Sequence, residues 1–143
     1  MLIAHVLRDK GAAVHTLSVE ASLHHAAQEL NTHKVGALVV IDLEGELVGV
    51  VSERDIVREV AKRGADAMEE KVSAVMTRKV ITAGMDETID ECLERMTDRR
   101  IRHLPVIDAG KLAGIISIGD LVKHRIAAVE AEAAAMQAYI TTH

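Results

Sequence analysis

The sequence has almost no aromatic residues. Phe and Trp are absent, and the single tyrosine, Tyr139, accounts for the whole aromatic content of 1%. The core therefore has to be aliphatic, and little surface is left on which the bases of a single-stranded nucleic acid could stack. The formal net charge of -5 argues in the same direction, because nucleic-acid-binding proteins usually carry a basic surplus. Composition thus predicts no nucleic-acid partner.

Cysteine and long apolar runs are scarce as well. A single cysteine, Cys92, excludes a disulfide within the chain, and its place on an apolar helix face predicts a small buried hydrophobe. The N-terminal MLIAHVLRDKG has too short an apolar run for a signal peptide, and no 18 uncharged apolar residues occur together. We therefore expect a soluble cytoplasmic protein that does not contact a membrane.

Recognisable metal and catalytic spacings are also missing. Among the eight histidines, His24 and His25 are adjacent, and adjacent side chains on a helix point about 100° apart. No His-x-x-x-His or Cys-x-x-Cys pair occurs. The chain has neither a nucleophile with a base at a known spacing nor a Gly-x-x-x-x-Gly-Lys phosphate loop. We therefore predict no metal site, no catalytic residues and no catalytic cofactor.

What the chain does contain is a tandem duplication. The segment Val35–Val60 recurs as Ile101–Ile126. In each copy a strand ends in Ile-Asp, a glycine turn follows, and a second strand closes on Gly-h-h-Ser-x-x-Asp, where h is aliphatic. Four apolar positions ahead of each copy also correspond, at the spacing of one helix face. These positions are Leu23, Ala26, Ala27 and Leu30 in the first copy and Ile89, Cys92, Leu93 and Met96 in the second.

Each copy predicts the element order β-α-β-β-α, which is an α/β (α+β) fold. The hydroxyls of Ser22 and Thr88 can cap two helices that run to about His33 and Asp98. A chain of 143 residues, 49% of them hydrophobic, can bury one respectable core, so we expect one compact unit of two repeats. The predicted strands are Val14–Thr16, Ala37–Ile41 and Leu47–Ser52 in the first copy, and Val80–Thr82 aligns with the first of them.

The predicted boundaries follow the repeats. Residues 1–64 form the first repeat, 65–71 a polar linker, 72–126 the second repeat and 127–143 a helical extension. Each repeat opens with a short helix or turn, at Leu2–Leu7 and around Val72–Met76.

The last helix departs from the repeat symmetry. It runs on towards Thr141 with apolar residues at alternating steps of four and three, which is the spacing of a heptad seam. Packing on its own domain accounts for the first two turns, but beyond Val129 little chain is left to cover the stripe. We therefore predict contact with a second subunit and a homodimer. The seam residues are Val122, Ile126, Val129, Ala133, Met136 and Ile140.

Two Ser-x-x-Asp segments, Ser52–Asp55 and Ser117–Asp120, stand where a strand turns into a helix. One interpretation is a capping box, in which the hydroxyl and the acid satisfy backbone donors at the helix start. The other is a ligand site, in which the hydroxyl and amides face a phosphate or ribose and the carboxylate accepts both hydrogen bonds of a cis-diol. The sequence leaves both open, and Gly49 and Gly114 would let ligand or backbone approach closely.

The second copy adds basic residues beside this segment. Arg102 and His103 enter the strand next to the one that ends at Ser117, within reach of an anion at the helix start. Their counterparts, Gly36 and Ala37, are neutral, so two pockets would differ in their capacity for phosphate. Arg54 could make up part of the difference.

These features resemble a tandem pair of CBS (cystathionine-β-synthase) domains, a Bateman module, of the small stand-alone bacterial type. The resemblance covers about residues 1–126 and rests on Val35–Asp42, Arg102–Asp108 and the two closing segments, with Val72–Thr77 similar to the usual opening of a repeat. It implies pseudo-twofold packing with two clefts between the repeats. In many members these clefts hold AMP, ADP, ATP, S-adenosylmethionine or NAD.

The resemblance also implies roles for individual residues. Ribose hydroxyls would be held by Asp55 and Asp120, and ribose or phosphate by Ser52 and Ser117. Arg102 and His103 would meet phosphate, whereas the departure at Gly36 and Ala37 weakens phosphate binding in that cleft. The adenine side would be lined by His15, Thr16, Ile81 and Thr82, and Arg54 and Pro105 complete the predicted ligand site.

Two functions follow as hypotheses. The first is a non-catalytic regulatory sensor of an adenine nucleotide or NAD(H), which would act on a separate effector protein. The alternative is a ligand-free interaction and dimerisation module that acts through the C-terminal helix, with both Ser-x-x-Asp segments serving only as caps.

Overall fold

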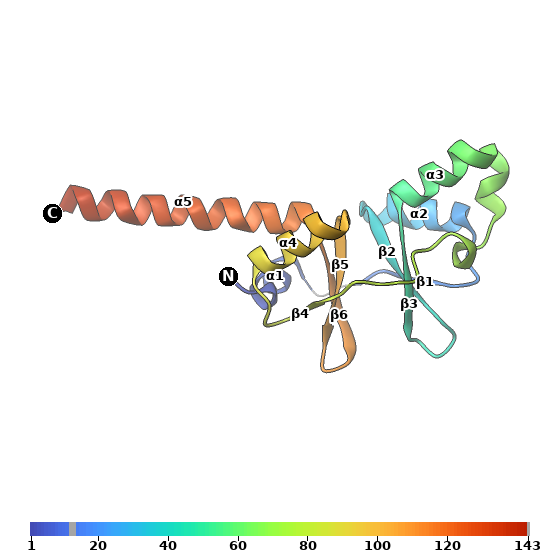
Figure 1. The fold of residues 1–143 in the computed structure, drawn as a ribbon, viewed down its shortest axis with the longest axis horizontal. Coiled ribbons are helices and arrows are strands. Elements are labelled where there is room, and N and C mark those ends of the chain that lie inside the picture. Colours follow the sequence, from blue (N-terminus) through green and yellow to red (C-terminus); the bar gives the residue numbers. More distant parts are fainter. Residues whose placement is uncertain (12–13, 143) are drawn as a thin grey trace. The chain divides into compact units, whose positions relative to one another are not determined.

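The structure is a computed structural model of the chain, and it describes residues 1–11 and 14–142. Two three-stranded sheets are flanked by helices, which confirms the α/β class and the repeated order of elements (Figure 1). The elements are α1 (Ile3–Lys10), β1 (Thr16–Ser18), α2 (Leu23–His33), β2 (Ala37–Ile41), β3 (Leu47–Ser52), α3 (Glu53–Arg63), the 3-10 helices η1 (Gly64–Glu69) and η2 (Val72–Ala74), β4 (Ala83–Gly84), α4 (Ile89–Arg99), β5 (His103–Asp108), β6 (Lys111–Ser117) and α5 (Ile118–Thr142).

The chain divides into two compact units, where one had been expected. The first-repeat unit is Ala13–Ile81, and the second-repeat unit is Met1–Ala12 together with Thr82–His143. The first unit holds the sheet β1-β2-β3 and the second holds β4-β5-β6. In each sheet the first strand runs parallel to the middle strand, and the middle strand forms an antiparallel hairpin with the third.

Both units are built on the aliphatic core that the composition predicts. In the first-repeat unit the predicted face of α2 contributes buried Leu23, Ala26 and Leu30, which pack with β2 and β3. In the second-repeat unit α4 buries its corresponding face, including Cys92 and Met96. Ser22 and Thr88 cap these helices, and each hydroxyl accepts from the backbone amide three residues on. The predicted bounds of these two helices are therefore close to those observed.

The short first strands lie later in the chain than predicted. Strand β1 begins at Thr16, where it pairs with Val39 of β2, and β4 begins at Ala83, where it pairs with Val106 of β5. The predicted strands Val14–Thr16 and Val80–Thr82 were therefore placed too early in the chain. Hydrogen bonds to the middle strand decide which residues extend the sheet.

Each repeat's opening segment packs with the other copy. The N-terminal α1 belongs to the second-repeat unit, where the amides of Ile3 and Ala4 donate to the carbonyls of Glu87 and Met85, both at 2.9 Å. Conversely, η2 lies in the first-repeat unit, where the Val72 amide donates to the Ala21 carbonyl at 2.8 Å. The compact units therefore cross the repeat boundaries at their edges.

Part of the expected linker is folded. It forms η1, which packs against α2 and α3 and buries Ala67 completely. The last helix, α5, reaches Thr142 as a continuous helix. Among the described residues, no helix is both long enough and apolar enough to cross a membrane.

The exchanged segments explain why the Gly-h-h-Ser-x-x-Asp motif begins with glycine in both copies. A Cβ placed on Gly49 would lie 2.5 Å from Met76 Sδ and 3.0 Å from the Thr77 carbonyl oxygen. A Cβ on Gly114 would lie 2.7 Å from a terminal methyl of Leu7. The close approach that these glycines were expected to permit is therefore made by the exchanged segments of the chain.

Adding a methyl group at these glycines should destabilise the protein unequally. We expect Gly49→Ala to lower the free energy of unfolding by roughly 1–3 kcal/mol, because the Thr77 carbonyl is backbone and cannot move aside easily. Gly114→Ala should cost less, since the end of the Leu7 side chain can rotate away. Urea unfolding measures both. Gly119→Ala is the control, measured on the dilute monomer, because within its own chain its Cβ would meet only Ser117 Oγ at 3.7 Å. A loss at Gly49 no larger than at Gly119 would contradict this account.

Candidate functional site

Reciprocal hydrogen bonds close both strand-to-helix corners. In the first corner (Ser52–Asp55) the Ser52 amide donates to Asp55 Oδ2 at 2.9 Å, and the Asp55 amide donates to Ser52 Oγ at 3.2 Å. In the second corner (Ser117–Asp120) the same two bonds measure 2.8 and 3.1 Å. The capping-box interpretation is therefore confirmed. Whether the same acids hold a ligand stays a prediction.

The carboxylate of the first corner is largely used within its own helix. Asp55 has a side chain only 10% exposed, and its Oδ1 accepts from Arg58 Nη2 at 2.7 Å, one turn further along α3. With Oδ2 held by the Ser52 amide, both oxygens already have partners. A ligand at this corner would have to displace Arg58 or share the acid with it.

The second corner is more open, and the cation that contacts its acid comes from a different helix. The side chain of Asp120 is 27% exposed, and its Oδ2 also accepts from Lys10 Nζ at 2.6 Å. Lys10 Nζ donates in addition to the Ile115 carbonyl at 2.8 Å. Sequence reasoning missed Lys10, which ends α1 and reaches this corner only because the opening segments are exchanged between the copies.

Lys10 sets the electrostatics of the second corner. Burial alone would raise the pKa of the Asp120 carboxyl, but hydrogen bonds from Lys10 and from the Ser117 amide outweigh it and hold that pKa below its ordinary value. The pKa of His103 is also lowered, first by burial and then by the positive charges of Lys10 and Arg102, against the opposing effect of Asp120. These four side chains therefore act on one another electrostatically.

The neighbouring strand places the predicted basic residues beside this corner. His103 pairs with Ser117 across the β5–β6 ladder, and the Ile118 amide donates to the Arg102 carbonyl at 2.8 Å. The first corner has the same backbone arrangement with neutral residues. There Ala37 pairs with Ser52, and Gly36 accepts from the Glu53 amide at 3.0 Å. The two corners thus share a backbone and differ in charge.

The predicted adenine-side residues lie along the first strand of each sheet or just before it. Thr16 is exposed at the start of β1, opposite Val39. The His15 ring stacks on the His33 ring with centroids 3.5 Å apart and planes 9° from parallel, a contact that sequence reasoning missed. The Thr82 carbonyl accepts from Arg95 Nη1 at 2.9 Å.

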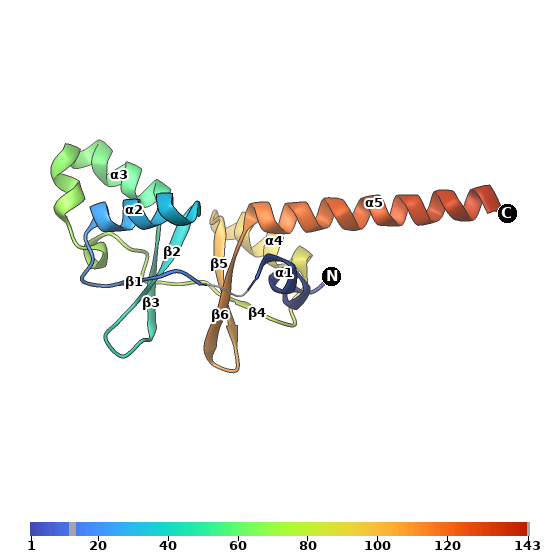
Figure 2. The ribbon, with the colours of Figure 1, turned by 180° about the vertical axis from the view of Figure 1, so that it is seen from behind.

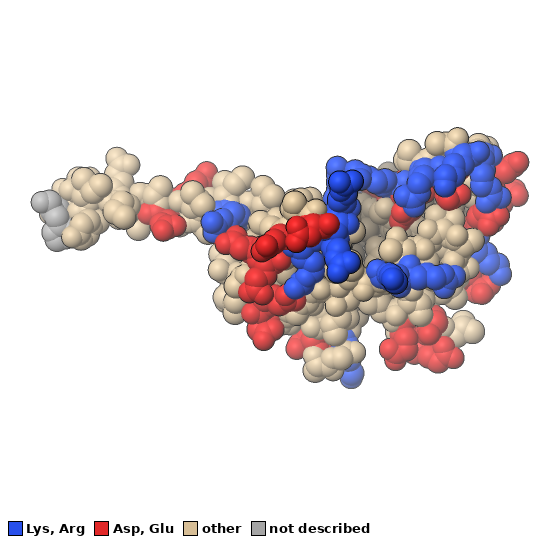
Figure 3. Space-filling model, in the orientation of Figure 1, with Lys and Arg blue, Asp and Glu red and all other residues tan. Residues whose placement is uncertain are grey.

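The remaining predicted residues have different surroundings. Ile81 is the last residue of the first-repeat unit and is partly buried. Arg54 is exposed on α3. Basic side chains gather over that helix in Figure 3. Pro105 is buried in β5, opposite Ile115 of β6, so its contribution is to packing of the sheet.

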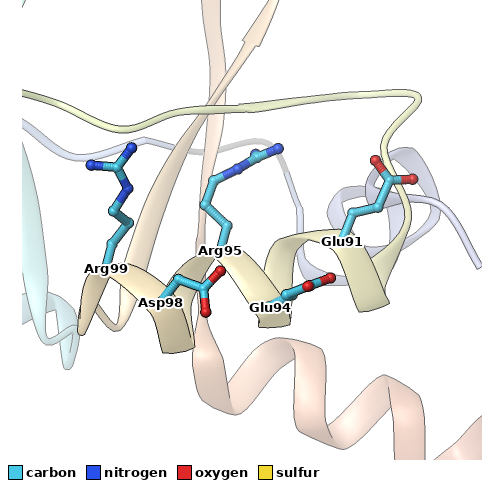
Figure 4. A pocket seen from close by; sticks show the side chains of 5 residues that line it. All are labelled: Glu91, Glu94, Arg95, Asp98 and Arg99. Atoms are coloured by element: carbon cyan, nitrogen blue, oxygen red, sulfur yellow. The ribbon is translucent and has the colours of Figure 1, made fainter.

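A shallow hollow of about 320 Å³ lies elsewhere, on the outer face of α4 (Figure 4). It contains none of the predicted site residues. Arg95, one of its lining residues, is hydrogen-bonded to Glu87, whose carboxyl pKa this guanidinium lowers. Among the described residues, no group of three His, Cys, Asp or Glu side chains is placed to hold a metal ion. The lining residues are Glu91, Glu94, Arg95, Asp98 and Arg99.

The family model for the CBS domain matches the chain twice, at residues 11–62 and 72–127. A 17.7 kDa protein of Acidianus ambivalens is 38% identical over 111 residues, which cover 77% of this chain and 66% of the relative. The chain thus spans about two thirds of that protein's length.

Solved structures match over most of their length. The CBS-domain containing protein ATU1752 from Agrobacterium tumefaciens is 44% identical with a TM-score of 0.85, over 87% of this chain and 92% of that one. The CBS domain pair of protein MJ0100, in complex with 5-methylthioadenosine and S-adenosyl-L-methionine, is 28% identical with a TM-score of 0.76, over 86% and 94%. CBS domain protein PAE2072 from Pyrobaculum aerophilum, complexed with AMP, is 28% identical with a TM-score of 0.75, over 84% and 89%.

Removing the Lys10 ammonium should raise the pKa of Asp120. Because the folded-state pKa of this acid is depressed, it contributes stability that is present above its unfolded pKa and lost as pH falls through its folded pKa. Lys10→Met removes the strongest of the lowering interactions, so this contribution should shrink or vanish. Carboxyl ¹³C titration by NMR measures the change.

Lys71→Met is the matched control for this titration. Lys71 Nζ donates to Glu20 Oε2 at 2.6 Å in the first-repeat unit, so it is an ion-paired lysine outside the second corner. Its removal should leave the Asp120 titration unchanged. An Asp120 pKa that stays constant in Lys10→Met would show that the amide of Ser117 alone depresses it.

Proposed function

This chain belongs to the CBS-domain family as a tandem pair, and we propose that it is a regulatory module that binds an adenosine-containing small molecule and catalyses no reaction. Two solved relatives support the ligand class, since one is complexed with AMP and the other with 5-methylthioadenosine and S-adenosyl-L-methionine. The candidates for this chain are AMP, ADP, ATP, NAD(H) and S-adenosylmethionine. A separate effector protein would receive the signal.

The proposal rests on the hydrogen bonds and the charge of the Asp120 carboxylate. Among the described residues, the hydrogen bonds to this carboxylate, from Ser117 and Lys10, all go to Oδ2. Oδ1 therefore remains able to accept a ribose hydroxyl, and the hydrogen bonds from Lys10 and Ser117, which lower the pKa of this carboxyl, favour its charged form. A carboxylate that is held in place and charged is well suited to a cis-diol.

Charge makes the second corner the better place for a phosphorylated ligand. A lysine ammonium has three donors, and Lys10 uses two of them, on Asp120 and on the Ile115 carbonyl. The third can meet an anion, and Arg102 adds a second positive charge nearby. At the first corner Gly36 and Ala37 bring no charge. We therefore assign the phosphate-bearing ligand to the second corner.

Ligand binding should be detected as thermal stabilisation that depends on Asp120. A ligand at about 100 times its Kd stabilises the folded state by about 2.7 kcal/mol, so at least one of AMP, ADP, ATP, NAD, NADH or S-adenosylmethionine should raise Tm. In Asp120→Asn the amide oxygen can still cap the helix, but the charge and the second acceptor are lost. Affinity should fall roughly tenfold or more, as measured by calorimetric titration.

Thr88→Ala separates loss of a cap from loss of a ligand contact. It removes the bond from the Glu91 amide to Thr88 Oγ1 in the same unit, and it should cost roughly 0.5–2 kcal/mol of stability with ligand affinity unchanged. If wild type and Asp120→Asn bind the ligand with equal affinity, Asp120 does not contact it. If none of the six compounds shifts Tm, the ligand-free interaction module is the better description.

The difference between the corners predicts selectivity for phosphate. Lys10→Met should weaken AMP binding by roughly tenfold, the value of one charge-assisted hydrogen bond, and leave adenosine binding within about twofold. Arg58→Met is the control, because it removes the cation beside the other acid, Asp55. If Lys10→Met weakens AMP and adenosine equally, Lys10 acts only by positioning Asp120 and does not meet the phosphate.

A further inference from the structure

The C-terminal part of α5 has an apolar stripe with nothing of its own unit to cover it. In Figure 1 and Figure 2, α1 and α4 of the same unit lie beside the first turns of α5, and no other described element of this unit lies beside the later turns. Every described residue from Val129 to Thr142 is exposed, and Val129 itself is 50% exposed. Its alanines favour helix, and the segment continues from turns of α5 that are already packed. The exposed apolar stripe is therefore a candidate surface for a partner.

The apolar residues form one seam along the helix. Gly119, Val122, Ile126, Val129, Ala133, Met136 and Ile140 follow one another in steps of three and four, which gives the core positions of a two-stranded coiled coil. Charged residues flank this seam in two groups (Figure 3). Lys123 and Arg125 stand near its start, and Glu130 and Glu132 stand one to two turns later. The flanks of the seam are thus positive around Lys123 and negative around Glu130.

From this pattern we propose that α5 pairs with α5 of a second copy of this chain, antiparallel, with Ile126 opposite Val129 of the partner subunit. This register also sets Val122 opposite Ala133 of the partner subunit and Met136 opposite Gly119 of the partner subunit. A long side chain then faces the one seam position that has no side chain. The inference rests on α5 alone and is independent of the proposed ligand.

Charge selects this arrangement over the others. In an antiparallel pair, the residues at heptad position e of one helix face the position-e residues of the other, and the same holds for position g. Lys123 and Glu130 share position e, so Lys123 meets Glu130 of the partner subunit, twice by symmetry. Arg125 likewise meets Glu132 of the partner subunit. Arg125 also lies 3.7 Å from Asp90 within its own unit, but both side chains are more than half exposed and such a pair is weak.

The competing arrangements match less well. If the antiparallel pair slides by one heptad towards the C-terminus, Glu130 faces Glu130 of the partner subunit and Glu132 faces Glu132 of the partner subunit. Both contacts are repulsive. A parallel pair would retain one attraction, from Arg125 to Glu130 of the partner subunit, and would leave Lys123 facing the apolar Ile118. The antiparallel register centred between Ile126 and Val129 is therefore the one that pairs all four charged positions.

The oligomeric state tests the seam. Sedimentation of the full chain should show a species of twice 15.5 kDa that dissociates on dilution. Val129→Glu buries a charge on each side of the seam and should raise the dimer Kd by more than about 100-fold. Ala131→Glu, on the opposite face of the same helix, is the matched control and should remain dimeric. Wild type that stays at 15.5 kDa, or two variants that dimerise equally well, would overturn the proposal.

A charge exchange tests the orientation. Lys123→Glu and Glu130→Lys should each weaken the dimer by roughly 5- to 50-fold, because two attractions become repulsions, and the double variant should recover wild-type affinity. A parallel dimer gives a different result, since Lys123→Glu would then have little effect and the double variant would stay as weak as Glu130→Lys. That outcome would overturn the antiparallel arrangement.

Discussion

The reciprocal pair of hydrogen bonds between a serine and an aspartate is the constraint on which each half of this protein depends. It ends β3 at Ser52 and β6 at Ser117, and it starts the next helix at the following residue. The same bonds hold a carboxylate in one orientation. A feature that stabilises a helix start is therefore also a fixed hydrogen-bond acceptor, so the capping role and the proposed ribose contact are compatible.

Duplication made two such corners, and exchange of the opening segments made them different. Helix α1 packs with the second copy and brings Lys10 to Asp120, whereas the acid of the first copy is paired with Arg58 of its own helix. The glycines before each corner accept this exchange, since a side chain there would collide with Leu7 or with Met76. Packing of the chain ends thus decides the charge of the site.

The long helix adds a second asymmetry. Its first turn belongs to the second corner, and its later turns have a seam that no element of the same unit covers. If two copies pair along this seam as proposed, Met136 would reach the corner of the partner subunit beside Gly119. Ligand binding and subunit association would then act on the same turn of helix, which is a simple way for a small module to transmit a signal.

The sequence by itself determined the duplicated β-α-β-β-α order, the buried faces of α2 and α4, their caps at Ser22 and Thr88, and the two corners with Arg102 and His103 beside one of them. These features are local, because periodicity, capping and turn chemistry act between residues a few positions apart. Only the tertiary structure decided that β1 and β4 begin at Thr16 and Ala83, that α1 crosses to the second copy, that His15 stacks on His33, and that Lys10 neutralises Asp120. Each of these depends on a contact between segments distant in the chain, and such contacts are set by packing of the whole unit rather than by any pattern along the sequence.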